Sequence, residues 1–144
     1  MHILMCNDDG ILADGLRHLA SYLSQYYRIT VVAPANEQSA KSHALTTEVP
    51  LKLDACNGED ENPRLYALTG TPSDCMKFGL SYLLTDDMPD LVISGINHGF
   101  NLGSDVLYSG TVSAAMESGF YGIPGLALSV ERYSVERGDE MLSL

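Results

Sequence analysis

Two adjacent acids, Asp8 and Asp9, lie one residue beyond the end of an apolar run, and their types and spacing suggest cation chemistry. The run from His2 to Cys6 is typical of a buried parallel strand, so the acids are expected at its carboxyl end. Neighbouring carboxylates disfavour joint ionisation, and partial burial adds a desolvation cost. A bound divalent cation would remove both penalties. The alternative, equally supported by Asn7-Asp8-Asp9-Gly10 alone, is that the acids cap the next helix and shape a turn.

Two further polar segments also follow predicted strands. Residues 36–43, with Ser39, come after a strand at 29–33, and residues 94–101, with Asn97, come after a strand at 90–94. Ligands bind outside the carboxyl ends of the strands in an open parallel sheet, so we expect these segments to converge with the acids. Their carboxylate, hydroxyl and amide oxygens favour a hard cation, Mg²⁺ or Mn²⁺, over zinc.

The segment Ser109-Gly110-Thr111 enters a predicted helix and offers a place for a phosphate group. Backbone N–H groups at a helix N-terminus, with glycine and hydroxyl side chains, favour anions, although a plain helix start is the alternative. Thr71 begins another helix, where a simple N-cap is favoured over an anion contact. A cation beside an anion site predicts phosphoryl chemistry, in which the cation lowers the pKa of a bound water and neutralises charge on the phosphate oxygens.

The elements that must position these groups alternate between strand and helix. Strands are predicted at 2–6, 29–33, 64–69, 90–94 and 125–130, and helices at 16–26, 71–84 and 110–121. A glycine-rich loop is expected from 95 to 109, and residues 47–53 could form a hairpin or an edge excursion. The alternation indicates an α/β fold, a mainly parallel sheet with helices on both faces. We expect one domain over 1–130, followed by a charged tail over 131–144.

Composition limits the class of protein. The 144 residues carry 8 basic and 19 acidic side chains, a net charge of −11, which argues against nucleic acid bound by a basic face but not against a mononucleotide. Cys6, Cys56 and Cys75 match no zinc or disulfide pattern and fit a reducing compartment. The sequence has no evident signal peptide and no apolar run of about 18 residues, so a soluble cytoplasmic protein with no membrane partner is expected.

Taken in order, these motifs resemble those of the SurE family, stationary-phase survival proteins that act as metal-dependent 5′/3′-nucleotidases. The matching segments are spread over nearly the whole chain: Asn7–Gly10, Val32–Pro34, Ser39 with Ser42, Gly70–Cys75, Ser94–Asn97, Gly99 with Asn101–Gly103, and Asp105–Val112. The resemblance implies a Rossmann-like three-layer sandwich. It also implies one divalent cation, Mg²⁺ or Mn²⁺, and a nucleoside monophosphate attacked by a metal-activated water. The metal ligands that it implies are Asp8, Asp9, Ser39 and Asn97.

The remaining candidate residues are expected to act in catalysis or in substrate binding. Asp8 and Asp9 are the catalytic candidates, and which of them would also act as a base stays open. The expected phosphate- and substrate-binding residues are Asn7, Ser42, Asn101, Ser109, Gly110 and Thr111. For Asn101, holding its own loop is an equal alternative. His43 and His98 could donate a proton to the leaving oxygen, but a surface role is favoured for both.

The chain departs from the family pattern in two loops and in length. Ser39-Ala40-Lys41-Ser42 lacks the family's usual glycine, and Ile11–Gly15 lacks its usual His and Pro, and both changes bear on substrate preference. Family members continue into a C-terminal segment with a dimer-forming arm, which we expect to be absent here. The homo-oligomer of the family is therefore doubtful for this short chain, and its activity is uncertain.

Two other classes of protein stay open. A receiver-like signalling domain also places paired acids after the first strand and binds Mg²⁺. It further needs a phosphoacceptor Asp after a middle strand and a Lys after a late one, whereas this chain has Asn97 and the run Ser129-Val130-Glu131 there. The remaining possibility is a truncated, inactive module that binds metal or nucleotide without turnover.

Overall fold

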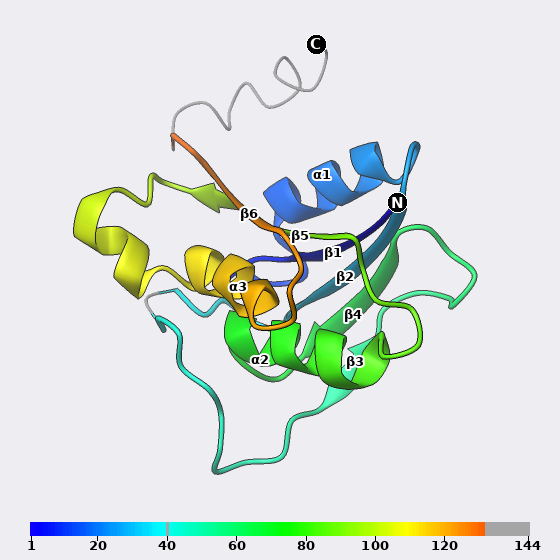
Figure 1. Cartoon of the computed structure of the whole chain (residues 1–144), viewed down its shortest axis with the longest axis horizontal. Helices are drawn as coiled ribbons and strands as arrows, with labels where there is room; N and C mark the ends of the chain where they lie inside the picture. The colour runs from blue at the N-terminus through cyan, green and yellow to red at the C-terminus, as the bar shows by residue number, and fades with distance from the viewer. Residues whose placement is uncertain (40, 132–144) are drawn as a thin grey trace.

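The computed structural model of the chain describes residues 1–39 and 41–131, and its strands form a single sheet (Figure 1). The sheet has six strands in the order β3-β4-β2-β1-β5-β6. All neighbouring pairs are parallel except β3 with β4 at one edge. The α/β fold with a mainly parallel sheet is confirmed. The strands are β1 (His2–Cys6), β2 (Arg28–Pro34), β3 (Leu53–Ala55), β4 (Arg64–Leu68), β5 (Leu91–His98) and β6 (Gly125–Val130).

Helices cover both faces of this sheet. One face packs against α1 (Asp14–Leu23), and the other packs against α2 (Pro72–Phe78) and α3 (Gly110–Gly119), as Figure 1 shows. A π-helical turn at Gly79–Leu83 extends α2, and a 3₁₀ helix at Gly103–Tyr108 precedes α3. The chain therefore forms the three layers expected of a Rossmann-like sandwich.

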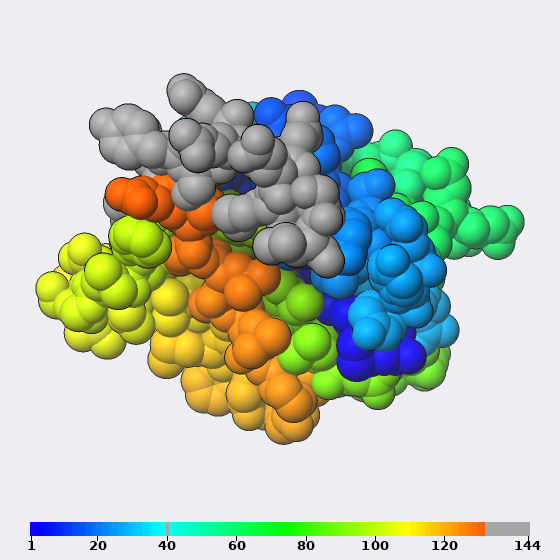
Figure 2. Space-filling view, turned by 90° about the horizontal axis from the view of Figure 1, so that it is seen from above, coloured from blue at the N-terminus to red at the C-terminus, as the bar shows by residue number. Residues whose placement is uncertain are grey.

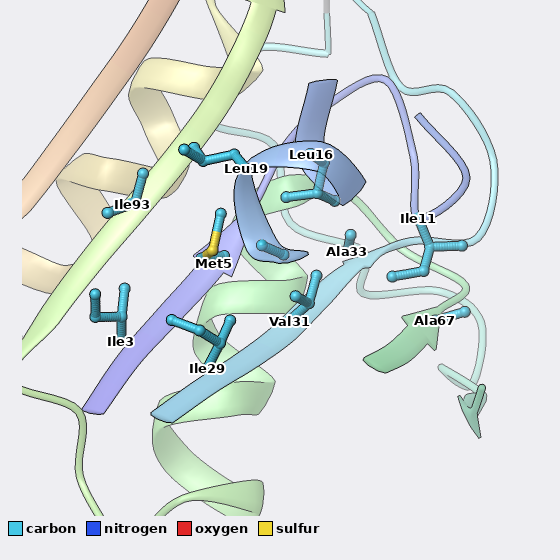
Figure 3. Close-up of a cluster of buried hydrophobic side chains, with 11 residues drawn as sticks. Ile3, Met5, Ile11, Leu16, Leu19, Ile29, Val31, Ala33, Ala67 and Ile93 are labelled. Carbon is cyan, nitrogen blue, oxygen red and sulfur yellow. The ribbon is translucent and has the colours of Figure 1, made fainter. Parts of the chain in front are cut away.

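Strand β1 supplies both halves of the core because successive strand side chains point to opposite faces. Ile3 and Met5 pack in the cluster under α1, together with Leu16 (Figure 3). Leu4 and Cys6 point the other way, into the cluster that α2 and α3 cover. Side chains on both faces of β1 are buried, so packing holds the strand in place, and with it the start of the turn at residues 7–10.

Most predicted elements agree with the structure, with differences at their ends. The strand at 125–130 is confirmed, and Thr71 begins α2 in a capping box with Asp74. In the segment 47–53, where a hairpin or an edge excursion was expected, only Leu53 belongs to a strand, the short edge strand β3. No helix among the described residues is long and apolar enough to cross a membrane. Residues 132–144 of the expected tail lie outside the described residues.

The predicted loop from 95 to 109 is wrong in two places. Strand β5 continues to His98 because Asn97 and His98 pair with Ser129 and Val130 of β6, beyond a register shift. Residues 103–108 then form the 3₁₀ helix. This segment projects beside α3 in the yellow part of the surface in Figure 2, with Leu107 70% exposed. The longer strand carries Asn97 out toward the end of the sheet.

Candidate active site

The strand order places a topological switch point between β1 and β5. From the central strand β1 the chain passes to β2 on one side, and it later returns to β5 on the other side. Such a switch point is where open α/β sheets bind ligands, outside the carboxyl ends of the strands. Asp8 and Asp9 follow β1, and Asn97 lies near the end of β5. The fold thus brings two of the predicted segments to the same edge of the sheet.

The turn that carries the acids is fixed by Asn7. Its side chain is fully buried, donates from Nδ2 to the Gly10 carbonyl at 3.1 Å and accepts the Gly10 N–H at 3.1 Å. Gly10 has a φ of +101°, and a Cβ there would lie 3.3 Å from the Pro34 carbonyl oxygen, so glycine is required. Asn7 therefore shapes the turn with its own amide, and these bonds use both ends of that amide.

Asp8 is held by the first turn of α3. The Thr111 hydroxyl donates to Asp8 Oδ1 at 2.6 Å, and both residues are buried. Gly110 makes this approach possible, because a Cβ there would lie only 2.9 Å from Asp8 Cβ. Ser109 caps the helix by accepting the Val112 N–H at 3.1 Å. Three predicted phosphate residues, Ser109 to Thr111, thus lie directly beside a predicted metal ligand.

Asp9 has a carboxylate oxygen that finds no partner. Its Oδ2 atom is buried and makes no hydrogen bond in the described part of the chain. Burial raises the pKa of Asp9, and the negative charges of Asp8 and Glu37 raise it further, while His98 opposes them. A buried polar atom without a partner calls for an explanation, and an ion is one of the usual ones.

The segment after β2 approaches through its backbone. The Gln38 N–H donates to the Asp8 carbonyl at 2.7 Å, so this segment reaches the acid turn. Ser39 is exposed and its hydroxyl donates to Glu37 Oε1 at 2.6 Å. Ser42 donates to the Leu107 carbonyl at 3.0 Å. Both hydroxyls donate to acceptors of the protein, and each hydroxyl oxygen can still accept a hydrogen bond or bind a cation through a lone pair.

Asn97, near the end of β5, and Asn101, in the segment that follows, each donate one hydrogen bond. Asn97 Nδ2 donates to the Gly99 carbonyl at 2.8 Å, which leaves its Oδ1 as a potential ligand atom. Asn101 Nδ2 donates to Ser129 Oγ at 2.8 Å. This contact agrees with the alternative that Asn101 holds its own loop.

The predicted residues therefore fall into two groups. Direct contacts join Asp8 to Gly110 and Thr111, and Asp9 follows in the same turn. Ser39, Ser42, Asn97 and Asn101 lie on neighbouring segments and bond within or between those segments. Within residues 1–39 and 41–131, no three His, Cys, Asp or Glu side chains are grouped to hold a metal, so neutral oxygens would have to complete a site.

Sequence reasoning missed two acidic residues near this region. Glu37 accepts the Ser39 proton and acts electrostatically on Asp9. Glu117, on α3, is buried and pairs with His43 at 2.7 Å. Glu37 lies in a polar segment that the motif analysis singled out, so its position was a usable signal. Glu117 lies in a helix of small residues, where the sequence offers no indication of a partner 74 residues away.

Known proteins match the chain over most of its length. The family model described as Survival protein SurE matches residues 3–143. The 5′-nucleotidase SurE of Thermoanaerobacter sp. (strain X514) is 54% identical over 129 residues, which is 90% of this chain and 50% of that protein. The 5′-nucleotidase SurE of Vibrio vulnificus (strain YJ016) is 50% identical over 130 residues, 90% of this chain and 49% of that protein.

A solved structure agrees with the same assignment. The crystal structure of the SurE protein from Aquifex aeolicus superposes with a TM-score of 0.79 at 37% sequence identity, covering 99% of this chain and 60% of that one. The chain spans about half the length of the curated relatives it matches.

Proposed function

Since this chain belongs to the SurE family, we propose that it is a phosphomonoesterase that hydrolyses nucleoside 5′- and 3′-monophosphates with the help of one divalent cation. The relatives from Thermoanaerobacter and Vibrio vulnificus carry the name 5′-nucleotidase. The single observation that carries the proposal for this chain is the acid turn after β1. There the buried, unpartnered Asp9 Oδ2 lies next to Asp8, beside the first turn of α3.

The available oxygens fit a hard cation. Asp8 and Asp9 would supply charge, and the Ser39 hydroxyl and the Asn97 Oδ1 would supply neutral donors. Mg²⁺ and Mn²⁺ prefer this set, because it contains no thiolate or imidazole. A cation would also offset the repulsion between the neighbouring acids, which contributes to the raised pKa of Asp9.

The chain's own residues would bind and orient the phosphate ester. The first N–H groups of α3 have no intrahelical partner, so those of Gly110 and Thr111 are suited to the non-bridging oxygens. The Thr111 hydroxyl keeps Asp8 in one orientation, because its proton is directed at Oδ1. Attack by water in line with the scissile P–O bond then releases phosphate and the nucleoside, whose oxygen takes up a proton. The cation, when bound, supplies Lewis-acid activation of water and offsets charge on the phosphate.

Phosphate release from AMP in the presence of Mn²⁺ tests this function. We expect release that stops when a chelator removes the cation and that falls by at least about 100-fold in Asp8→Asn, because a charged ligand is lost. Asp60→Asn, an exposed acid in the loop before β4, is the matched control and should leave release unchanged. Release that persists with chelator, or that survives Asp8→Asn, would remove the proposed mechanism. Mn²⁺ binding without any release would indicate an inactive binding module instead.

A further inference from the structure

The pair His43–Glu117 lies outside the residues assigned above to phosphate and metal. His43 Nε2 is 2.7 Å from Glu117 Oε2, and the Glu117 side chain is only 8% exposed. Burying a carboxylate is costly unless it is paired and hydrogen-bonded. Among the described residues, His43 is the only side chain that pairs with Glu117. The Phe120 ring flanks the same imidazole, with ring centroids 6.3 Å apart. The position of His43 is therefore fixed by α3.

Neighbouring residues of the same segment are also anchored. Ser42 has a φ of 55°, a conformation that a non-glycine residue keeps only when its surroundings hold it, and its hydroxyl is bonded to the Leu107 carbonyl. The Ala44 carbonyl accepts the Thr71 hydroxyl at 2.6 Å. His43 thus lies between a contact with the 3₁₀ helix and a contact with the start of α2, and it supplies a contact with α3.

Helix α3 connects this anchor to the acid turn. Thr111 in its first turn holds Asp8, and Glu117 lies six residues further on, about 9 Å along the axis at 1.5 Å per residue. Ser39 precedes His43 by four residues, and the N–H of Gln38, next to Ser39, is bonded to the Asp8 carbonyl. One rigid helix therefore contacts both the acid turn and the segment that carries Ser39.

We propose that the His43–Glu117 pair is a positioning device, which fixes the Ser39 segment at a set distance from Asp8 and Asp9 and thereby raises cation affinity. The inference rests on the proposed function for the identity of the ligand. Neither His43 nor Glu117 touches the substrate in this scheme. Residues that orient metal ligands from outside the ligand set typically change metal affinity by about 10–100-fold when they are replaced.

The experiment compares His43→Ala, His43→Gln and Glu117→Gln with the unaltered chain. Mn²⁺ affinity is measured by the loss of the free-ion EPR signal, and amide hydrogen exchange is followed on peptides covering residues 36–46. We expect His43→Ala to weaken Mn²⁺ binding about 10-fold. The Gln38 amide should exchange faster, while the Thr46 amide, bonded to Asp74, should change less. His43→Gln keeps a donor for Glu117 and should restore most of the affinity.

Two controls separate positioning from loss of fold. His18→Ala removes an exposed histidine on α1 and should leave both readouts unchanged. With AMP as substrate, the Mn²⁺ concentration for half-maximal activity should rise in His43→Ala, while kcat at saturating Mn²⁺ stays within about twofold. If His43→Ala unfolds, the comparison passes to Glu117→Gln, which keeps the side-chain volume and an acceptor oxygen but loses the charge.

The outcomes distinguish this inference from the proposed function. Unchanged Mn²⁺ affinity and unchanged exchange at Gln38 in folded variants would overturn the positioning role. Faster exchange with unchanged Mn²⁺ affinity would also overturn it, because the pair would then hold the segment without serving the cation. If the unaltered chain binds no Mn²⁺, both proposals fail for the cation. If it binds Mn²⁺ in the predicted way but releases no phosphate, the proposed function alone fails.

Discussion

Replacing Thr111 by Val tests the contact that joins α3 to the acid turn. The substitution removes the hydroxyl that donates to Asp8 Oδ1 at 2.6 Å and keeps almost the same shape. Thr111 is 0% exposed and Asp8 is 6% exposed, so water cannot easily replace the lost donor. The expected effect is therefore an electrostatic loss and not a cavity.

The magnitude follows from the kind of bond. A hydrogen bond to a charged group contributes about 1.5–3 kcal/mol to stability, against about 1 kcal/mol for a neutral pair. We expect Thr111→Val to lower the free energy of unfolding by about 2 kcal/mol. For a chain of this length, that corresponds to a fall in Tm of about 4–8 °C.

Urea unfolding of a double-mutant cycle provides the assay. In the Asp8→Asn background the acceptor is neutral, so the cost of Thr111→Val should shrink by about 1 kcal/mol. Ser113→Ala, which removes a buried hydroxyl bonded to the Ser109 carbonyl at 2.7 Å, is a control for loss of a neutral bond. An equal cost of Thr111→Val with Asp8 and with Asn at position 8 would refute the claim that the hydroxyl stabilises a carboxylate.

Three more predictions concern ionisable side chains. Asp9→Asn should raise the free energy of unfolding in chelator at pH 7 and abolish Mn²⁺ binding. The pKa of Asp9 is raised in the folded chain, so charging this carboxyl costs stability above its unfolded pKa of 3.8. A lower free energy of unfolding for the variant in urea would contradict this. Burial lowers the pKa of His2 from 6.5, so as the pH falls the imidazole takes up a proton in the unfolded chain before it does so in the folded chain, and the free energy of unfolding decreases below about pH 6.5. His2→Gln should flatten this part of the pH–stability curve, and an unchanged curve would argue against the prediction. The exposed Cys56 should be the only one of the three thiols that reacts rapidly with a thiol reagent in the native chain. Cys6 and Cys75 are buried, and burial raises the pKa of the Cys75 thiol well above its usual value. Rapid reaction of a second thiol would disprove this.

Local patterns predicted the elements whose signals lie within one segment. The apolar run His2–Cys6 gave a strand buried on both faces, and Thr71 with Asp74 gave a capped helix start. The strand predicted at 2–6 places Asp8 and Asp9 beyond its carboxyl end, the edge of a parallel sheet at which ligands bind. These features need only spacing and residue type, which the sequence states directly.

Features that depend on distant partners could not be predicted. The sequence at the end of β5 is typical of a glycine-rich loop, and the pairing of Asn97 and His98 with Ser129 and Val130 makes it a strand. The His43–Glu117 contact spans 74 residues, so neither side chain looks different from a surface residue in its own segment. Asn7 was predicted to bind substrate, and in the structure both hydrogen bonds of its side-chain amide go to Gly10 in the same turn. Tertiary contacts, which single-segment patterns do not contain, decide these three cases.

The contact between Thr111 and Asp8 also has a consequence for folding kinetics. It joins residues 103 positions apart, so the loop between them must close before the acid turn gains its partner. A chain that leaves the ribosome N-terminus first can pair β1 with β2 long before α3 has been synthesised. Asp8 therefore gains its hydrogen bond to Thr111 only after α3 has been synthesised and has docked on the sheet.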